Sequence, residues 1–508
     1  MARAELWLPS IESDHALLQA GKKIALRGRA QAGTEVTVRF VGTDGADRSS
    51  FKATAASDGH WAGSLADLAP DTAGELRIET GNGEKRVVSD VLVGQVWLAS
   101  GQSNMVYRIG APPAGFVEQV TANIQLAKTQ AAAAQPPIRV FQVTGPGSDS
   151  EKDDVSGHWV AATPENVEGV SAVAWFFCVD LLNALHQPVG VIISCVGGTP
   201  AEAWMPEEAV KSTKAGQEAT ARFQKQLEGY TPEKEKEDKA TWDAWLKEYP
   251  TPELQAQHTR PHRLVTPTSG NAPSRLYNGL IHGLEPYPLA GVIWFQADGN
   301  EGHPFEYSEL IQGLIKSWRA RWQDELPFYY VEMNNMRNDP QKEPVEYNFL
   351  SLIREQQEGA LLLPKTGVVA SLDLGVKDPH FPNKKPVGDR LANLALHGVY
   401  GKNLGVVNSP QYSSLENEGG KLRVHLQYAQ GLRVRGGGAA QGFAIREADG
   451  KWVWANASLE GEDVILSSPE APKPVAARYA WAMFPTISVE NSVGLPLRPF
   501  RTDTEAPR

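Results

Sequence analysis

Hydrophobic and polar positions alternate over short runs in the first ninety residues. Residues 23–29 and 34–41 follow this alternation, and Gly45 and Gly59 stand in turn sequences beside such runs. A period of two predicts half-buried strands, and closely spaced short strands with turns are typical of a sandwich or jelly roll. We therefore expect an N-terminal β-sandwich over residues 1–90.

The pattern changes near residue 91 to apolar runs that alternate with helical stretches such as 172–185. Five runs are nearly apolar throughout: 91–99, 189–195, 289–295, 328–333 and 366–372. Continuous apolar runs are expected for strands that are buried on both faces of a parallel sheet. Their alternation with helices predicts an α/β domain with a doubly wound parallel sheet over residues 91–402.

Residues 207–269 are more charged and interrupt this alternation. Trp242, Trp245, Leu246 and Tyr249 fall on one face of a helix, at i, i+3, i+4 and i+7. We interpret the segment as a helical insertion whose aromatic face packs internally, with a sugar platform as the alternative. After residue 402, strands and turns return and predict a C-terminal β region over 403–508. This region forms its own domain or shares a sandwich with the N-terminal strands.

Composition narrows the classes of function. The chain has 508 residues, of which 41% are hydrophobic and 21% charged, as expected for a globular protein of several domains. The net charge is -11 and no run is rich in lysine or arginine, so we expect no nucleic-acid partner. No apolar run is long enough for a bilayer, so we expect no membrane span. Cys178 and Cys195 are the only cysteines and are expected to be buried free thiols.

A serine stands just beyond the first apolar run, in the sequence Gly-Gln-Ser-Asn-Met at residues 101–105. Open α/β sheets bind ligands at the carboxyl ends of their strands, so Ser103 is a candidate nucleophile. The Gly-x-Ser-x-Gly motif does not occur in the chain, which disfavours an α/β-hydrolase. By itself, a serine after a strand is more often a helix N-cap, so the assignment depends on other segments.

Polar segments also follow other apolar runs, at residues 197–204, 296–301 and 373–382. Residues 91–105, 197–204 and 291–296 resemble the sialate O-acetylesterase-like branch of the SGNH hydrolases, which also includes acetylesterases acting on plant cell-wall polysaccharides. The resemblance extends to three further stretches: 276–281, 378–388 and 494–503. It implies a flavodoxin-like SGNH-hydrolase fold for the α/β domain.

The resemblance also implies the catalytic residues. Ser103 would attack the acetyl carbonyl, and His380 would take its proton and return it to the departing sugar hydroxyl. Asp378 would orient His380, with Asp373 as the alternative. Here Pro379 stands between Asp378 and His380, where the family commonly has isoleucine, and it stiffens the backbone at that point.

The oxyanion of the tetrahedral intermediate needs hydrogen-bond donors that are fixed in advance. The resemblance assigns the backbone N–H groups of Ser103 and Gly198 and a side-chain amide, with Gln296 as first choice and Asn300 as second. The family usually has glycine where this chain has Ala297, so the loop is expected to run differently.

Three more residues are predicted beside the pocket. Glu202 and Trp204 match family positions there, with an anchoring structural role as the alternative to sugar contact. His303 follows Asn300 closely and would line the pocket, with a solvated loop position as the alternative. No metal site and no cofactor are predicted, since Asp298 and Glu301 have no third ligand at suitable spacing.

The predicted function is removal of acetyl groups from a carbohydrate, either acetylated hemicellulose of the xylan type or O-acetylated sialic acid. The presence of 14 tryptophans favours hemicellulose slightly, because aromatic faces can stack on neutral sugar rings. The alternatives are a carbohydrate-binding protein that has lost catalysis and an esterase for a different short or aromatic acyl group. The sequence does not indicate an oligomeric state. The resemblance implies a periplasmic or secreted protein, with the cytoplasm as the alternative because residues 1–5 do not begin a signal-peptide pattern.

Overall fold

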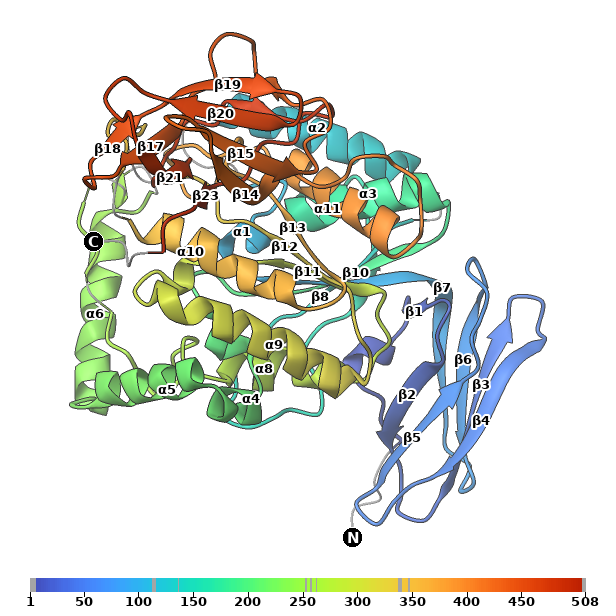
Figure 1. The fold of residues 1–508 in the computed structure, drawn as a ribbon. Coiled ribbons are helices and arrows are strands. Elements are labelled where there is room, and N and C mark those ends of the chain that lie inside the picture. Colours follow the sequence, from blue (N-terminus) through green and yellow to red (C-terminus); the bar gives the residue numbers. More distant parts are fainter. Residues whose placement is uncertain are drawn as a thin grey trace.

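The structure is a computed structural model, shown in Figure 1. It describes residues 6–111, 116–135, 137–251, 254–255, 258–261, 263–336, 340–345 and 348–504. None of the helices in these ranges combines the length and the hydropathy that a bilayer-spanning helix requires.

A mostly parallel sheet forms the centre of the molecule (Figure 1). Its strands, in spatial order, are β13 (Thr366–Val369), β12 (Phe328–Val331), β11 (Gly291–Phe295), β7 (Lys85–Gly101), β10 (Val189–Cys195), β8 (Arg139–Gln142) and β9 (Trp159–Ala161). Every neighbouring pair is parallel except β8 with β9 at the edge. The five predicted apolar runs all contain strands of this sheet, whereas the short β8 and β9 were not predicted.

Helices cover both faces of this sheet (Figure 1). One face carries α2 (Val117–Ala133), α3 (Ala172–Leu185) and α11 (Lys385–Gly398), and the opposite face carries α8 (Arg275–Leu280), α9 (Tyr307–Trp322) and α10 (Phe349–Gln357). The mixed α/β class is thus confirmed.

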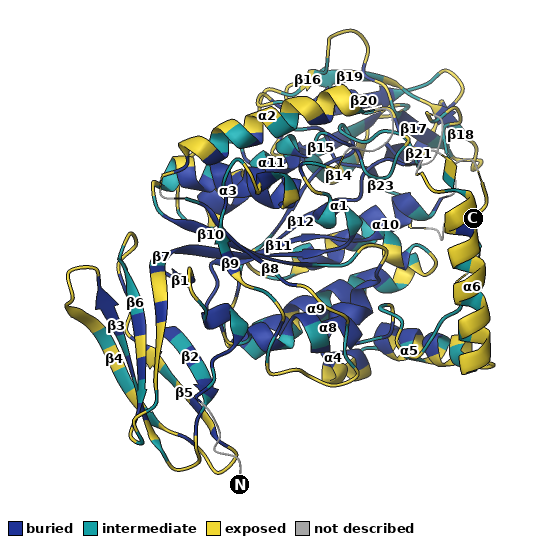
Figure 2. Ribbon diagram, turned by 180° about the vertical axis from the view of Figure 1, so that it is seen from behind, coloured by how far each residue is buried: buried dark blue, intermediate teal, exposed yellow. Residues whose placement is uncertain are grey.

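Side chains along β7 explain why its sequence is apolar without interruption. Val96 and Leu98 belong to the apolar cluster beneath α9, whereas Trp97 and Ala99 belong to the cluster beneath α3 and α11. All four are fully buried, and the central strands are dark blue in Figure 2. Successive side chains of a strand point to opposite faces, so a strand covered on both sides needs an apolar residue at every position.

The order of the parallel strands reverses beside β7. From β7 the chain forms β8, β9 and then β10 on one side, and it then crosses to β11, β12 and β13 on the other. In open α/β sheets, ligands bind at the carboxyl ends of the strands next to such a reversal. The segments that follow β7, β10 and β11 therefore lie where a binding site is expected.

The N-terminal strands pack as two antiparallel layers. One layer pairs β4 (Asp47–Thr54), β3 (Glu35–Gly42), β6 (Ala73–Thr80) and the start of β7, and the other is the ribbon of β2 (Ile24–Arg29) with β5 (His60–Leu65). A short strand, β1 (Leu17–Gln19), pairs in parallel with β7. The predicted boundary at residues 90 and 91 falls inside β7, which runs without a break from these strands into the central sheet.

The predicted insertion is helical. It contains α4 (Glu207–Ser212), α5 (Lys214–Leu227) and α6 (Pro232–Glu248). Trp245 is buried and its ring lies 5.4 Å from that of Trp242, while Leu246 is more than one third exposed. Most of α6 is solvent-exposed, as its yellow ribbon in Figure 2 shows, so only part of the aromatic face packs internally.

The C-terminal region builds sheets of its own. One sheet contains β14 (Gln411–Asn417), β15 (Leu422–Gln427), β20 (Asp463–Ser467) and β19 (Asn456–Glu460); a second contains β18 (Trp452–Trp454), β17 (Phe443–Glu447), β21 (Pro474–Tyr479) and β23 (Phe500–Arg501); a ribbon joins β16 (Arg433–Val434) to β22 (Val489–Glu490). These strands enclose a separate apolar cluster and lie at the opposite end of the molecule from β2–β6 (Figure 1). The alternative of a sandwich shared by the two ends is therefore wrong.

Buried arginines join the C-terminal region to the central domain. Arg354, on α10, donates to the carbonyl oxygens of Asn334 and Ala482 at 3.0 and 2.7 Å. Arg498 donates to Glu332 at 3.0 Å, and the two side chains are only 2% and 1% exposed. A guanidinium suits this position because it offers five N–H donors in a fixed plane.

We expect Arg498→Met to lower the free energy of unfolding by about 3–5 kcal/mol, because it leaves the Glu332 carboxylate buried without its partner. Urea unfolding followed by tryptophan fluorescence measures the change. Arg433→Met is the matched control, since Arg433 is 54% exposed and, among the described residues, its ion-pair partner is Glu490 alone. Equal stability of the two variants would contradict the prediction.

Candidate active site

Ser103 stands at the carboxyl end of β7, as the first residue of the short helix α1 (Ser103–Val106). The chain turns sharply just before it, at Gly101, where φ is +128°. A Cβ at this position would lie 2.3 Å from the carbonyl oxygen of Phe295 on β11, so only glycine fits. The Gln102 N–H donates to that carbonyl oxygen at 2.9 Å, which fixes the residue before Ser103 against β11.

The loop after β10 passes beside Ser103. A Cβ built on Gly197 would lie 3.4 Å from the Ser103 Cβ, and Gly198 has a φ of +71°, a conformation that glycine adopts without strain. The backbone N–H groups of Ser103 and Gly198 have no hydrogen-bond acceptor within the described ranges. The two backbone donors predicted for the oxyanion are thus both free for a ligand.

The segment after β11 decides between the two candidate amides. Gln296 is buried, and its Nε2 donates to the Thr199 carbonyl oxygen at 3.1 Å and to Asn300 Oδ1 at 2.9 Å. Its oxygen accepts from the Tyr307 hydroxyl. Both amide hydrogens are therefore used inside the protein, and the first choice of Gln296 as oxyanion donor is not supported.

Asn300 retains a donor. Its Oδ1 accepts from the Ala201 N–H at 2.9 Å, and its Nδ2 donates one hydrogen to Glu202 Oε2 at 2.8 Å. The second hydrogen on Nδ2 has no acceptor among the described residues. The short η5 helix (Asp298–Asn300) places this side chain beside the loop after β10, so Ala297 does not prevent the loop from presenting an amide.

Glu202 lies behind Asn300 and is almost completely buried. Burial raises the pKa of its carboxyl group, and this outweighs the hydrogen bond from Asn300, which lowers it. With one oxygen held by Asn300 and its side chain out of solvent, Glu202 fits the anchoring role that we gave as the alternative to sugar contact.

The other two predicted pocket residues differ from each other. Trp204 is fully buried, its Nε1 donates to the Thr199 hydroxyl at 3.0 Å, and its ring packs edge-on against Trp294. It cannot stack on a sugar, so its predicted substrate contact is wrong and the structural alternative holds. His303 is half exposed, with its Nδ1 3.8 Å from Glu306 Oε1, and its role in the pocket stays a prediction.

Asp378 and His380 lie together in the loop between β13 and α11. Asp378 Oδ1 accepts from the backbone N–H of His380 at 2.7 Å and lies 3.5 Å from the imidazole Nδ1. The hydrogen bond from His380 lowers the pKa of Asp378 below its ordinary value, although partial burial acts in the opposite direction. The carboxylate is therefore ionised at neutral pH, and Pro379 does not keep it away from the imidazole.

Amide hydrogen bonds bring the segments of Ser103 and His380 side by side. Asn104, the residue after Ser103, donates from Nδ2 to the carbonyl oxygen of Pro379, the residue before His380, at 3.0 Å. Asn334, which follows β12, donates to the same carbonyl oxygen at 3.2 Å. Neither asparagine was predicted as a site residue, although Asn104 lies inside the Gly-Gln-Ser-Asn-Met stretch that carries the resemblance.

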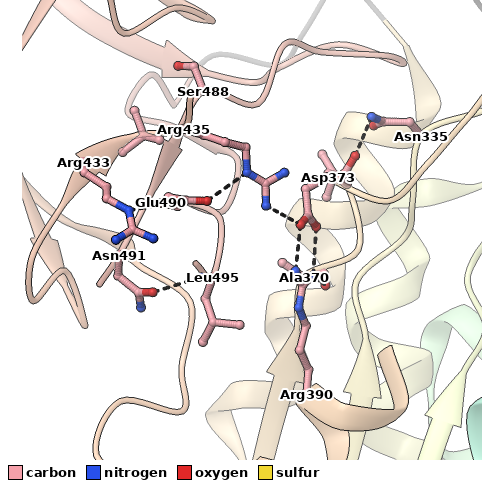
Figure 3. Close-up of polar contacts among 12 residues, drawn as sticks. Asn335, Ala370, Asp373, Arg390, Arg433, Arg435, Ser488, Glu490, Asn491 and Leu495 are labelled. Carbon is pink, nitrogen blue, oxygen red and sulfur yellow. Dashed lines mark hydrogen bonds and ion pairs between the residues drawn. The ribbon is translucent and has the colours of Figure 1, made fainter. Parts of the chain in front are cut away.

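Asp373 has a different environment, shown in Figure 3. Its carboxylate accepts from both terminal nitrogens of Arg390 at 2.8 and 2.7 Å and from Arg435 at 2.7 Å, and its side chain is 1% exposed. Arg435 lies between Asp373 and Glu490 of the C-terminal region (Figure 3). Two arginines bind Asp373 through three charged hydrogen bonds, so it fixes the start of the loop that carries His380. The carboxylate found beside the imidazole is that of Asp378, which favours Asp378 over Asp373 as the partner of His380.

Comparisons with known proteins agree with the resemblance. The solved structure of a carbohydrate acetylesterase from Xanthomonas citri superposes with a TM-score of 0.79 and 31% sequence identity, over 98% of this chain and 100% of that one. Curated sialate O-acetylesterases match at 25% identity over 434 residues for Mus musculus and at 26% over 434 residues for Homo sapiens, 78% of this chain in both cases and 74% and 72% of the relatives. No family model matches.

These relatives are all ester hydrolases of the acetylesterase class. The chain belongs to the sialate O-acetylesterase-like family of carbohydrate acetylesterases.

We expect Arg435→Met to unfold at a higher pH than the wild type when the protein is acidified. Burial alone would raise the pKa of Asp373, but hydrogen bonds and charge from Arg390 and Arg435 hold it below its ordinary value. A carboxyl group with a lowered folded-state pKa contributes stability above its unfolded pKa and loses it as the pH falls through the folded pKa. Removing one guanidinium raises that folded pKa, so the loss begins earlier.

Tryptophan fluorescence during acid titration measures this midpoint. Arg433→Met again serves as the control, because Arg433 pairs with Glu490 in the same network without touching Asp373. If both variants unfold at the same pH, Arg435 does not stabilise the ionised Asp373.

Proposed function

We propose that the protein is a carbohydrate O-acetylesterase that works through a Ser-His-Asp acyl-enzyme mechanism on an SGNH-type α/β domain, flanked by the β regions at 1–90 and 403–508. The observation that carries this proposal is the hydrogen bond from Asn104 to the Pro379 carbonyl oxygen. This bond joins Asn104, which follows Ser103 at the end of β7, to Pro379, which precedes His380. Asp378 lies beside the imidazole of His380.

In this mechanism the Ser103 hydroxyl attacks the acetyl carbonyl carbon while His380 accepts the hydroxyl proton. The tetrahedral intermediate collapses, the sugar oxygen leaves, and His380 returns the proton to it. A water molecule then attacks the acetyl-serine with the same help from His380 and releases acetate. Asp378, ionised beside the imidazole, orients the ring and stabilises its protonated form.

The negative oxygen of each intermediate would be bound by the backbone N–H groups of Ser103 and Gly198 and by the free Nδ2 hydrogen of Asn300. Glu202 supports this assignment, because it takes the other Nδ2 hydrogen and fixes the plane of the amide. Donors held in place by the protein need no reorganisation as charge develops, which is the main source of their catalytic effect.

Two substrate classes stay in the proposal. The names of the curated relatives support an O-acetylated sialic acid, and the neighbour from Xanthomonas citri supports an acetylated carbohydrate in general. The number of tryptophans does not favour hemicellulose, because many of them are buried and cannot stack on a sugar ring. Six are among the largest fully buried side chains: Trp97, Trp159, Trp175, Trp204, Trp294 and Trp318. From the family resemblance we propose that the protein works outside the cytoplasm, as a periplasmic or secreted enzyme.

We expect the wild type to hydrolyse p-nitrophenyl acetate and Ser103→Ala to fall below about one thousandth of that rate. Acetate release from acetylated xylan and from O-acetylated sialic acid, measured in parallel, distinguishes the two substrate classes. Propionyl and feruloyl esters test the alternative of another acyl group. If the wild type cleaves none of these esters, the esterase proposal fails, and binding of the same glycans tests the alternative of a binding protein.

A second prediction tests the oxyanion donor. Asn300→Asp keeps the oxygen that accepts from the Ala201 N–H but removes the amide hydrogens and adds negative charge. We expect kcat, expressed per folded molecule counted by native tryptophan fluorescence, to fall by about 10²–10³ with KM nearly unchanged. A kcat within about threefold of the wild type would remove Asn300 from the oxyanion site.

A further inference from the structure

Lys384 is a fully buried lysine close to the candidate active site. It is the last residue before α11, and its ammonium group lies 3.4 Å from the ring centroid of Phe381 and 5.0 Å from that of Tyr107. The ring of Phe295, at the end of β11, is 5.7 Å away. Aromatic faces attract a cation but give it no hydrogen-bond acceptor.

A buried ammonium group is costly unless its N–H donors find oxygen. Within the described part of the chain, Lys384 Nζ donates a hydrogen bond to Asn104 Oδ1. Burial holds the pKa of Lys384 well below its ordinary value, and the negative charge of Asp378 opposes this effect. Burial of the Lys384 ammonium group is therefore unfavourable, and its hydrogen bond to Asn104, the residue that follows Ser103, offsets part of this cost.

Lys384 fixes which way the Asn104 amide points. In its charged form, which the surrounding aromatic faces attract, the lysine has donors only and therefore faces the oxygen of the carboxamide. The nitrogen then points the other way and donates to the Pro379 carbonyl oxygen at 3.0 Å and to Asn334 Oδ1 at 3.3 Å. If the lysine were absent, the amide could rotate and present its oxygen to the Pro379 carbonyl, which would repel it.

We propose that Lys384 is a positioning residue for catalysis, which sets the Asn104 carboxamide so that it holds Pro379, and with it His380, at a fixed place relative to Ser103. This inference rests on the proposed function and adds a residue to it. Lys384 touches no substrate in this arrangement and acts through Asn104.

The contacts distinguish this role from simple packing. An apolar side chain would fill a cage of three aromatic rings better than a lysine, because it needs no oxygen partner and no desolvation of charge. The geometry of a nucleophile and its base is sensitive, since a misplacement of about 1 Å can reduce a rate by about 100-fold. A residue that maintains that geometry should change kcat in molecules that are correctly folded.

The experiment compares Lys384→Met with the wild type, using p-nitrophenyl acetate and the natural substrate that the wild type cleaves. Native tryptophan fluorescence counts the folded molecules, each with one active site, so kcat is expressed per active site and loss of folded protein does not enter. We expect kcat per active site to fall about 10- to 100-fold, with KM changed less than about threefold. Lys385→Met is the matched control, because Lys385 pairs with Asp389 at 2.7 Å and should leave kcat unchanged.

Asn104→Asp keeps the test decisive if Lys384→Met folds poorly. It preserves an oxygen for Lys384, with a favourable charge, and removes the N–H donors to Pro379. We expect this variant to fold with a kcat per active site as low as that of Lys384→Met. The double variant should be no slower than the slower single variant, since both changes break the same connection.

The possible results separate this inference from the proposed function. If the wild type cleaves no ester, the proposed function fails and the inference fails with it. If the wild type is active and either Lys384→Met or Asn104→Asp retains kcat per active site within about twofold, the positioning role is overturned while the esterase proposal stands. Independent, additive losses in the two variants would also overturn it.

Discussion

Parallel pairing of β7 with both β10 and β11 is the constraint on which the site depends. Parallel strands end at the same edge of a sheet, so the three loops that follow them meet there. The approach is close, because Gly101 leaves no room for a side chain against the Phe295 carbonyl oxygen. Ser103 and the Gly197 loop are thereby brought together by backbone hydrogen bonds and by two glycines, whereas the side chain of Asn300 is held by its own hydrogen bonds to Ala201 and Glu202.

Charged groups fix the rest of the site from a distance. The loop that carries His380 begins at Asp373, which is bound by Arg390 from α11 and by Arg435 from the C-terminal region. Arg354 and Arg498 connect the same C-terminal region to the backbone and side chains that follow β12. The C-terminal β region is thus part of the framework of the catalytic domain. Buried ion pairs are costly to form, but once formed they are costly to break, which suits a loop that must not move.

Neutral amides make the finer adjustments. Gln296 donates its two amide hydrogens to Asn300 and to the carbonyl oxygen of Thr199. Glu202 accepts one of the two Nδ2 hydrogens of Asn300, so the other Nδ2 hydrogen of Asn300 is directed away from Glu202. On the other side of Ser103, Asn104 and Asn334 hold the Pro379 carbonyl oxygen. Each carboxamide donates and accepts in fixed directions, so a network of this kind specifies orientation as well as distance.

Continuous apolar runs, which mark strands buried on both faces, were enough to predict the class of fold from the amino-acid sequence. The candidate nucleophile and its base came from the family resemblance of the stretches around Ser103 and His380. The amino-acid sequence also placed Asp378 two residues before His380 and predicted the helical insertion. Only the tertiary structure showed that Gln296 is saturated, that Asp373 is bound by two arginines and that Trp204 is buried. The first two outcomes rest on hydrogen bonds between distant positions, such as Gln296 and Thr199, which are 97 residues apart, and Asp373 and Arg435, which are 62 residues apart. Local pattern carries no information about such partners, since they become neighbours only when the strands have paired.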